Sequence, residues 1–245
     1  MLNKKLYFLA FLVSLLTLFV NCDKKMDAKL LVQKSIAAHG GSEKWESIAK
    51  IDYKKETLLY FPNGDFERKI VQKISHSFEP FSTLIESEKL GSISKSIYQS
   101  GKVQLFENNK EVFDSLQLNQ ALQSAKGALY VFWQPYKLLD SGTKLEYQGV
   151  KKLLDSLAVH VLKVSYPEGK QNDIWHYFFN TNTFKLQATQ VNHDGKISLI
   201  MNETTETQTG LSLNKTRKSF FLDSLGKIDY LRAAYDYQIE AVVKH

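Results

Sequence analysis

The sequence contains one cysteine, Cys22, and only four prolines among its 245 residues. A single cysteine excludes an internal disulfide framework, and it also excludes a zinc site built on paired cysteines. Prolines are scarce, and no Pro-, Gly- or Ser-rich linker divides the chain after residue 21. We therefore predict a single domain that spans residues 22 to 245.

The sequence also lacks any block of five or six like charges. Its 32 Lys and Arg residues are scattered among 26 Asp and Glu residues, and the formal net charge is +6. A nucleic-acid-binding domain normally concentrates its basic residues in a stripe or carries a recognisable binding motif. We therefore expect no nucleic-acid partner.

Catalytic signatures are absent as well. The sequence has no G-x-S-x-G elbow, no H-E-x-x-H pair, no phosphate-binding loop and no G-x-G-x-x-G. The one grouping that offers an alternative is His160, His176 and Asp173, because neighbouring strands could bring these side chains together as the site of an envelope hydrolase. We expect ordinary hydrogen-bonded histidines instead, with no enzymatic activity, no cofactor and no metal.

The N-terminus has the layout of a secretory signal. A basic start, MLNKK, is followed by an uninterrupted apolar run from Leu6 to Val20. That run is shorter than the roughly 20 residues of a membrane-spanning helix, and it ends just before the only cysteine. The segment resembles a bacterial lipobox, although Asn21 replaces the usual small residue. We predict a signal peptide over residues 1 to 21 and lipidation of Cys22; a free thiol is the alternative.

Periodicity predicts two helices and an otherwise β-rich chain. Apolar residues at helical spacing predict a helix over residues 27 to 38, with Asp27 as its cap and Gly40 and Gly41 at its end. The same pattern predicts a second helix over 114 to 133, which must cross a face or an open end of the sheet. His39, in the last turn of the first helix, is expected to be structural.

From Ile51 onward, alternating apolar and charged residues are separated by hairpin signals such as FPNGDF and YQSGKV. The final segment fits a strand or a helix, and we assign it as a strand. The fold class is therefore α+β: a large curved antiparallel sheet or half-open β-barrel, with an N-terminal helix and a central helical lid. The predicted strands cover residues 51–61, 66–76, 81–88, 92–99, 102–107, 143–149, 157–166, 173–180, 184–192, 196–208, 213–221 and 228–243.

Aromatic residues are unusually dense in two of these segments. IWHYFF, at 174 to 179, is apolar on both faces of a strand, and YVFWQPY, at 130 to 136, adds further rings beside the second helix. Such surfaces meet either a second protein layer or a ligand in a cavity. On aromatic content we select Trp133, Trp175, Tyr177 and Phe179 as candidate ligand-binding residues.

Several motifs together resemble a known group of proteins. The lipobox-like segment is followed by HGG and a tryptophan, then by QPYKLLDSG, DIWHYFFNTNTFKL and GLSLNKTRKSF. This layout is similar to a family of uncharacterised Gram-negative envelope lipoproteins that resembles the outer-membrane lipoprotein carrier and receptor proteins LolA and LolB. The resemblance implies a half-open barrel that is lined with apolar side chains and, in the carrier proteins, holds acyl chains.

The leading hypothesis is therefore a membrane-anchored, non-enzymatic protein that binds a lipid, acyl chain or other hydrophobic ligand. We expect it in the cell envelope, anchored to the outer membrane and facing the periplasm. A structural or regulatory lipoprotein that binds another envelope protein is the alternative, because a shared fold does not fix function.

Overall fold

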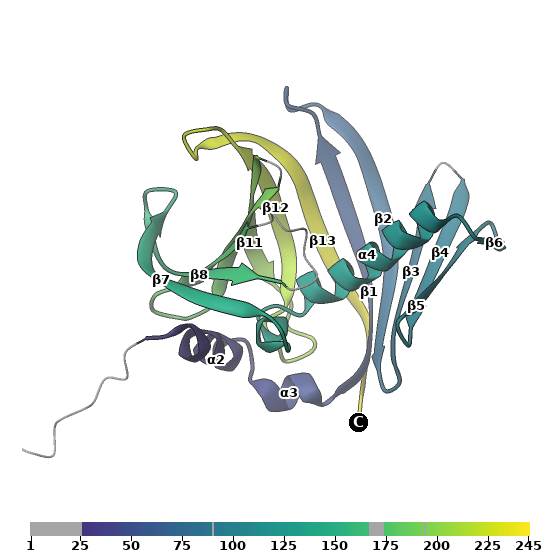
Figure 1. The fold of residues 1–245 in the computed structure, drawn as a ribbon, viewed down its shortest axis with the longest axis horizontal. Helices are drawn as coiled ribbons and strands as arrows, with labels where there is room; N and C mark the ends of the chain where they lie inside the picture. Colours follow the sequence, from purple (N-terminus) through teal and green to yellow (C-terminus); the bar gives the residue numbers. More distant parts are fainter. Residues whose placement is uncertain (1–25, 90, 167–173, 194) are drawn as a thin grey trace, which may run out of the picture.

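A single antiparallel sheet dominates the computed structural model, which describes residues 26–89, 91–166, 174–193 and 195–245 (Figure 1). Cys22 and Asp173 lie outside these ranges. In chain order the elements are α2 (Ala28–Ala38), α3 (Ser42–Glu46), β1 (Ile48–Tyr60), β2 (Phe66–Phe78), β3 (Phe81–Lys89), β4 (Ser92–Gln99), β5 (Lys102–Glu107), β6 (Lys110–Val112), α4 (Ser115–Phe132), η2 (Tyr136–Leu139), β7 (Lys144–Leu153), β8 (Leu157–Ser165), β9 (Ile174–Asn180), β10 (Leu186–His193), β11 (Lys196–Thr205), β12 (Asn214–Leu222) and β13 (Ile228–Lys244).

The strand order explains how the chain builds this sheet. It runs β6-β5-β4-β3-β2-β1-β13-β12-β11-β10-β9-β8-β7, so two meanders meet where the first strand pairs with the last. Along that junction Thr57 lies opposite Tyr235 and Lys55 opposite Tyr237. Hairpins connect the neighbours within each meander, as the turn signals predicted; Gly64 and Gly101 have φ values of 88° and 78°, which favour glycine.

Helix α4 connects the two edges of the sheet. It begins after β6, at one edge, and leads through η2 to β7, at the other. Eighteen residues of α-helix extend about 27 Å, and this length lies inside the curve of the sheet (Figure 1). The Asp114 carboxylate caps the helix by accepting a hydrogen bond from the Gln117 N–H at 2.8 Å. The predicted central helical lid is therefore confirmed.

The N-terminal helix is fixed to the sheet through its last turn. Asp27 caps α2 by accepting from the Leu30 N–H at 2.8 Å, and His39 ends it with Nδ1 2.8 Å from the Ser35 carbonyl oxygen. The His39 carbonyl oxygen accepts from the Tyr136 hydroxyl at 3.0 Å and from the Ser212 N–H at 2.8 Å. His39 thus joins α2 to η2 and to the loop before β12, which is the structural role expected for it.

The main core lies between the inner face of the sheet and the helices. Trp133 and Phe132, at the end of α4, pack against Tyr53 and Trp45; the Tyr53 and Phe132 ring centroids are 4.0 Å apart. A second, smaller cluster lies on the outer face of the sheet. It includes Val161 of β8 and Phe178 of β9, which are paired across the two strands. The apolar character of both faces of β8 and β9 therefore reflects one buried cluster on each face of the sheet.

The predicted fold class is confirmed, with small differences in the elements. Strand β6 was not predicted, because three residues are too few to show alternation. The strand expected from residue 184 begins at Leu186, since Phe184 sits in the preceding turn with a φ of 57°. The last segment is a strand along its whole length. No helix in the described ranges is long and apolar enough to cross a membrane.

Candidate functional site

One flank of α4, beside the buried face formed by Ala121, Ala125, Leu129 and Phe132, carries small side chains. Ser124, Gly127 and Ala128 lie on it at helical spacing, followed one turn later by Val131. A Cβ built on Gly127 would have no atom within 4 Å, apart from those of its own helix. This flank of the helix is therefore open, whereas the adjacent face is buried.

A cavity of about 330 Å³ lies between this helix and the sheet. Its other wall is the inner face of strands from both meanders, and the apolar part of that wall includes Ile85, Trp175 and Ile200. A second cavity of about 210 Å³ adjoins it and shares Gln72, Ile85 and Ser124. The volume of the larger cavity is within the range of about 300 to 1,000 Å³ that is typical of small-molecule sites.

Two cationic side chains reach this cavity. Arg217 on β12 is 4% exposed; its Nε donates to Asn202 Oδ1 at 2.8 Å and its Nη2 to Thr189 Oγ1 at 3.4 Å. Lys55 on β1 holds its Nζ 5.4 Å from the centre of the Tyr235 ring. No acidic residue lines the larger cavity in the part of the chain that the structure describes. The cavity is therefore electrically positive as well as partly apolar.

A buried chain of polar groups ends at the same cavity. Gln134 Nε2 donates to the Tyr177 hydroxyl at 2.9 Å, and that hydroxyl lies 2.7 Å from the hydroxyl of Tyr166. Burial raises the pKa of Tyr177, so its hydroxyl stays protonated. Gln134 is 3% exposed, and its Oε1 has no hydrogen-bond partner among the described residues. A buried, unpaired polar atom of this kind is costly unless something else binds it.

The four aromatic residues selected from the sequence occupy different environments. Trp175 lines the larger cavity and stacks near Tyr177, with ring centroids 6.4 Å apart. Tyr177 supports the cavity through Gln134. Trp133 and Phe179 are fully buried in the main core and do not line this cavity.

Sequence reasoning missed Arg217, Lys55 and Gln134. Arg217 lies within GLSLNKTRKSF and Gln134 begins QPYKLLDSG, two of the motifs that carried the family resemblance. For Arg217 and Gln134, their presence in those motifs was the only signal. Lys55 lies in neither motif, and a lone cation in a strand looks like a surface residue. Strand pairing is what turns Arg217 inward, opposite Tyr235.

The histidines of the hydrolase alternative do not meet. Strand pairing places His160 opposite Phe179, and His176 opposite Lys163. His160 and Lys163 are three residues apart on β8, so His160 and His176 point to opposite faces of the sheet. His160 instead pairs with the Tyr147 hydroxyl at 2.8 Å. Across the described ranges, no three His, Cys, Asp or Glu side chains are grouped as metal ligands.

Another histidine, His76, is fully buried in the wall of the sheet. Its Nε2 lies 3.1 Å from the Tyr53 hydroxyl, and its Nδ1 lies 2.9 Å from Thr83 Oγ1. Burial lowers its pKa to about 3, although the charge of Asp52 acts in the opposite direction. The native protein therefore keeps His76 neutral at pH values where the unfolded chain binds a proton.

We expect acid to destabilise the protein through His76. Between the ordinary histidine pKa of 6.5 and the native pKa of about 3, the unfolded state holds more protons on this side chain, so the free energy of unfolding falls as the pH falls. From pH 7 to pH 5 this amounts to about 2 kcal/mol. In urea titrations at the two pH values, His76→Gln should lose about that much less stability than the parent protein.

The matched control is His245→Gln, which removes an exposed histidine at the end of β13. This variant should show the parent's loss of stability. An equal loss in His76→Gln would contradict the assignment of the acid sensitivity to His76.

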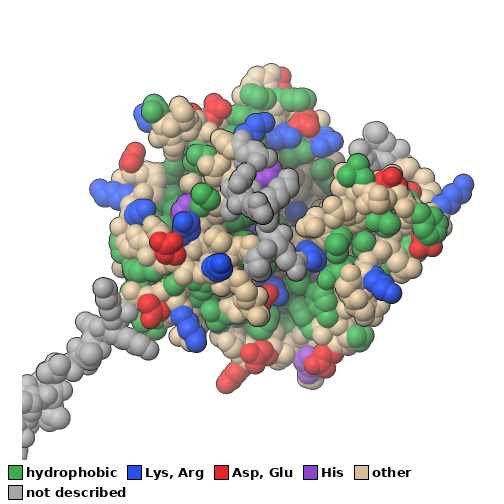
Figure 2. Space-filling view, in the orientation of Figure 1, with side chains coloured by type: hydrophobic (Ala, Val, Ile, Leu, Met, Phe, Trp, Pro, Cys, Tyr) green, Lys and Arg blue, Asp and Glu red, His purple; other side chains and the backbone are tan. Residues whose placement is uncertain are grey.

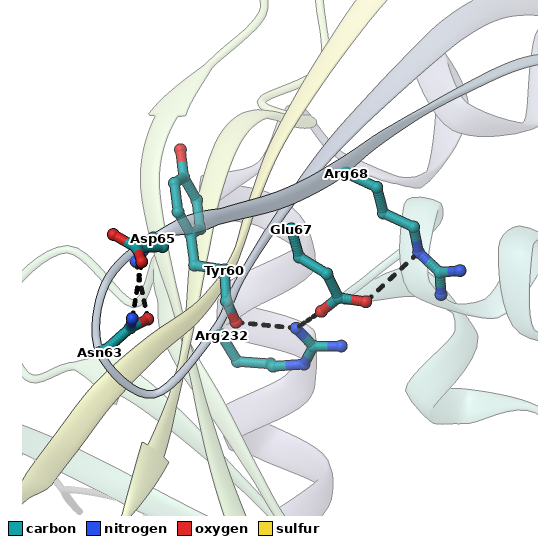
Figure 3. Close-up of polar contacts among 6 residues, drawn as sticks. All are labelled: Tyr60, Asn63, Asp65, Glu67, Arg68 and Arg232. Atoms are coloured by element: carbon teal, nitrogen blue, oxygen red, sulfur yellow. Dashed lines mark hydrogen bonds and ion pairs between the residues drawn. The ribbon is translucent and has the colours of Figure 1, made fainter.

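Two hairpin turns that lie apart from the cavity carry exposed apolar side chains. Phe66 is 57% exposed at the β1–β2 turn, and Leu225 is 79% exposed at the β12–β13 turn. Figure 3 shows how the first of these hairpins is held: Arg232 of β13 donates to the Tyr60 carbonyl oxygen at 2.8 Å and pairs with Glu67. Arg232 thus ties the start of β13 to the hairpin of β1 and β2. On the face seen in Figure 2, acidic and basic side chains are interspersed.

Solved structures with the same fold define the class of protein. A LolA superfamily protein from Nitrosomonas europaea is similar at a TM-score of 0.54 and 8% identity, over 87% of this chain and 92% of that one. A DUF1329 family protein from Desulfovibrio piger is similar at a TM-score of 0.50 and 7% identity, over 89% and 92%. The chain therefore has a LolA-like fold; at these identities the likeness extends to the fold alone.

A family model narrows the assignment. The chain belongs to a family of unknown function, DUF6503, whose model matches residues 4–197. No curated protein matches the chain significantly in sequence. The predicted resemblance to an uncharacterised family with a LolA-like fold is thus confirmed.

Proposed function

We propose that this protein binds a lipid, an acyl chain or another hydrophobic molecule in the cavity beneath α4, and that it does so without catalysing a reaction. The observation that carries the proposal is the cavity itself, whose helical wall consists of the small residues Ser124, Gly127 and Ala128 and of Val131. A packed interior normally has few voids larger than a water molecule.

The walls of the cavity suit a small apolar ligand. Burying a methylene group contributes about 0.8 kcal/mol, so one acyl chain among Ile85, Trp175 and Ile200 gains enough free energy to be retained. A volume of about 330 Å³ is at the lower end of the usual range for ligand sites. It fits a single chain better than a lipid with several chains. The LolA-like fold supports this role through the resemblance to lipoprotein carrier and receptor proteins.

We place the protein in the cell envelope, held by acyl groups on Cys22 and facing the periplasm from the outer membrane. The support comes from the sequence: a basic start, an apolar run and a cysteine directly after it. Several acyl chains at one cysteine would give durable attachment, since a single chain binds a membrane only marginally. The mass of the mature N-terminal peptide tests this, and Cys22→Ser should move the protein into the soluble fraction.

Mass spectrometry of the full chain tests the binding function. The protein is extracted from envelope membranes in copolymer discs, without detergent that could displace a ligand, and is then analysed intact. We expect one hydrophobic molecule per protein chain. A folded, monodisperse protein with nothing bound would overturn the proposal. It would favour instead a role in binding another envelope protein, for which the exposed side chains of Phe66 and Leu225 offer a surface.

A further inference from the structure

The larger cavity has a polar end that a purely hydrophobic ligand would leave unsatisfied. Arg217 is almost completely buried, and its hydrogen bonds run to the neutral side chains of Asn202 and Thr189. A guanidinium group has five N–H donors, so most of its donors are left over after these two bonds. Within the described part of the chain, its charge has no carboxylate partner.

Burying such a charge without a counter-charge is unfavourable. Proteins normally resolve this cost with a salt bridge or with a bound anion. Lys55, which lines the same cavity, adds a second positive charge instead of compensating the first. The electrostatics of the cavity therefore favour an anion between these two side chains.

Gln134 supplies a third group for such a ligand. Its amide is held by the Tyr177 hydroxyl, and its other polar atom is buried and unpaired among the described residues. A tyrosine hydroxyl both donates and accepts, so the amide can turn either its oxygen or its NH₂ group to a ligand. It can thus bind an ionised or a protonated acidic head group.

We infer that the ligand is a single-chain anionic amphiphile, whose acidic head group binds Arg217, Lys55 and Gln134 while its chain lies along Ile85 and Val131. This inference rests on the proposed function, because it specifies the ligand of the same cavity. A carboxylate and a phosphate monoester share the required chemistry: a compact anionic group with several acceptor oxygens. Arginine binds carboxylate and phosphate groups through bidentate hydrogen bonds.

Photo-cross-linking in membranes that carry the full chain tests the inference. The probe is a palmitate analogue with a diazirine in its chain, and the competitors are palmitate, hexadecanol and monohexadecyl phosphate. Palmitate or the phosphate should compete at about tenfold lower concentration than hexadecanol, because hydrogen bonds to charged groups contribute more than those to neutral ones. Whichever acid competes at the lower concentration identifies the head group.

Variants separate the head group from the chain. Arg217→Met should reduce cross-linking about tenfold or more, and Arg217→Lys should restore part of it because the charge returns. The control Arg68→Met removes an exposed arginine on β2 and should leave cross-linking unchanged. Lys55→Met provides a second test at a less buried position, in case Arg217→Met does not fold.

The outcomes distinguish this inference from the proposed function. Competition by hexadecanol as effective as that by the acids would overturn the anionic head group and leave hydrophobic binding intact. No cross-link to the folded parent protein, or a cross-link that none of the three competitors reduces, would overturn both.

Discussion

Replacing Gly127 with tryptophan is expected to abolish ligand binding while the protein remains folded. Gly127 lies on the side of α4 that lines the larger cavity, and a Cβ at this position would point into open space. An indole ring at this position has room to turn into the volume of about 330 Å³ that we assign to the ligand, because Gly127 lines it. In the detergent-free extraction, Gly127→Trp should carry no bound molecule where the parent protein carries one.

The matched control is Gly127→Ala, which adds a single methyl group to the same helix. It should keep its ligand and gain about 1 kcal/mol of stability, because alanine stabilises a helix interior relative to glycine. Urea unfolding of both variants shows whether they are folded. Full ligand occupancy in a folded Gly127→Trp variant would place the binding site elsewhere and refute the assignment of this cavity.

The sheet could be predicted because its signals are local. Alternation identifies each strand within a few residues, and turns such as Asn63-Gly64 fix which strands become neighbours. The path of α4 could be predicted too, since a helix between two strand meanders has to cross the sheet that they form. Register shifts, such as the one between Tyr147 and Val150, left no mark in the sequence and had to be seen in the structure.

The candidate site could not be predicted in the same way. Arg217 and Lys55 come from β12 and β1, and they converge only because both strands pair with β13, on either side of Tyr235 and Tyr237. Their roles therefore depend on long-range pairing. Local sequence shows only one arginine and one lysine among 32 basic residues. Neither the burial of Arg217 nor the lack of an acid among the described residues that line the cavity is visible before folding.

Aromatic content predicted that rings gather in this region, but not which of them border open space. Trp133 follows the last turn of α4 and is enclosed by Trp45, Phe78 and Phe132. Trp175 instead lies on strand β9 and lines the cavity. The two tryptophans looked equivalent in the sequence because both stand in apolar segments. Their surroundings give them different expected roles.

Truncating these two residues should therefore give opposite results. Trp133→Ala removes a fully buried ring from the main core and should cost about 3 to 5 kcal/mol of stability, the range for large-to-small core substitutions. Trp175→Ala removes a partly buried ring from the cavity wall. It should cost clearly less stability and weaken ligand retention. Urea unfolding and native mass spectrometry measure the two effects separately.

Comparing the two variants tests whether Trp133 belongs to the core and Trp175 to the cavity wall. If Trp133 belongs to the core alone, a Trp133→Ala protein that still folds at low temperature should retain its ligand, because the walls near Arg217 and α4 are intact. A Trp133→Ala variant that is as stable as the parent but empty would reverse the assignment and make Trp133 a ligand contact. The same reversal for Trp175, lost stability with full ligand occupancy, would move that residue from the cavity wall to the core.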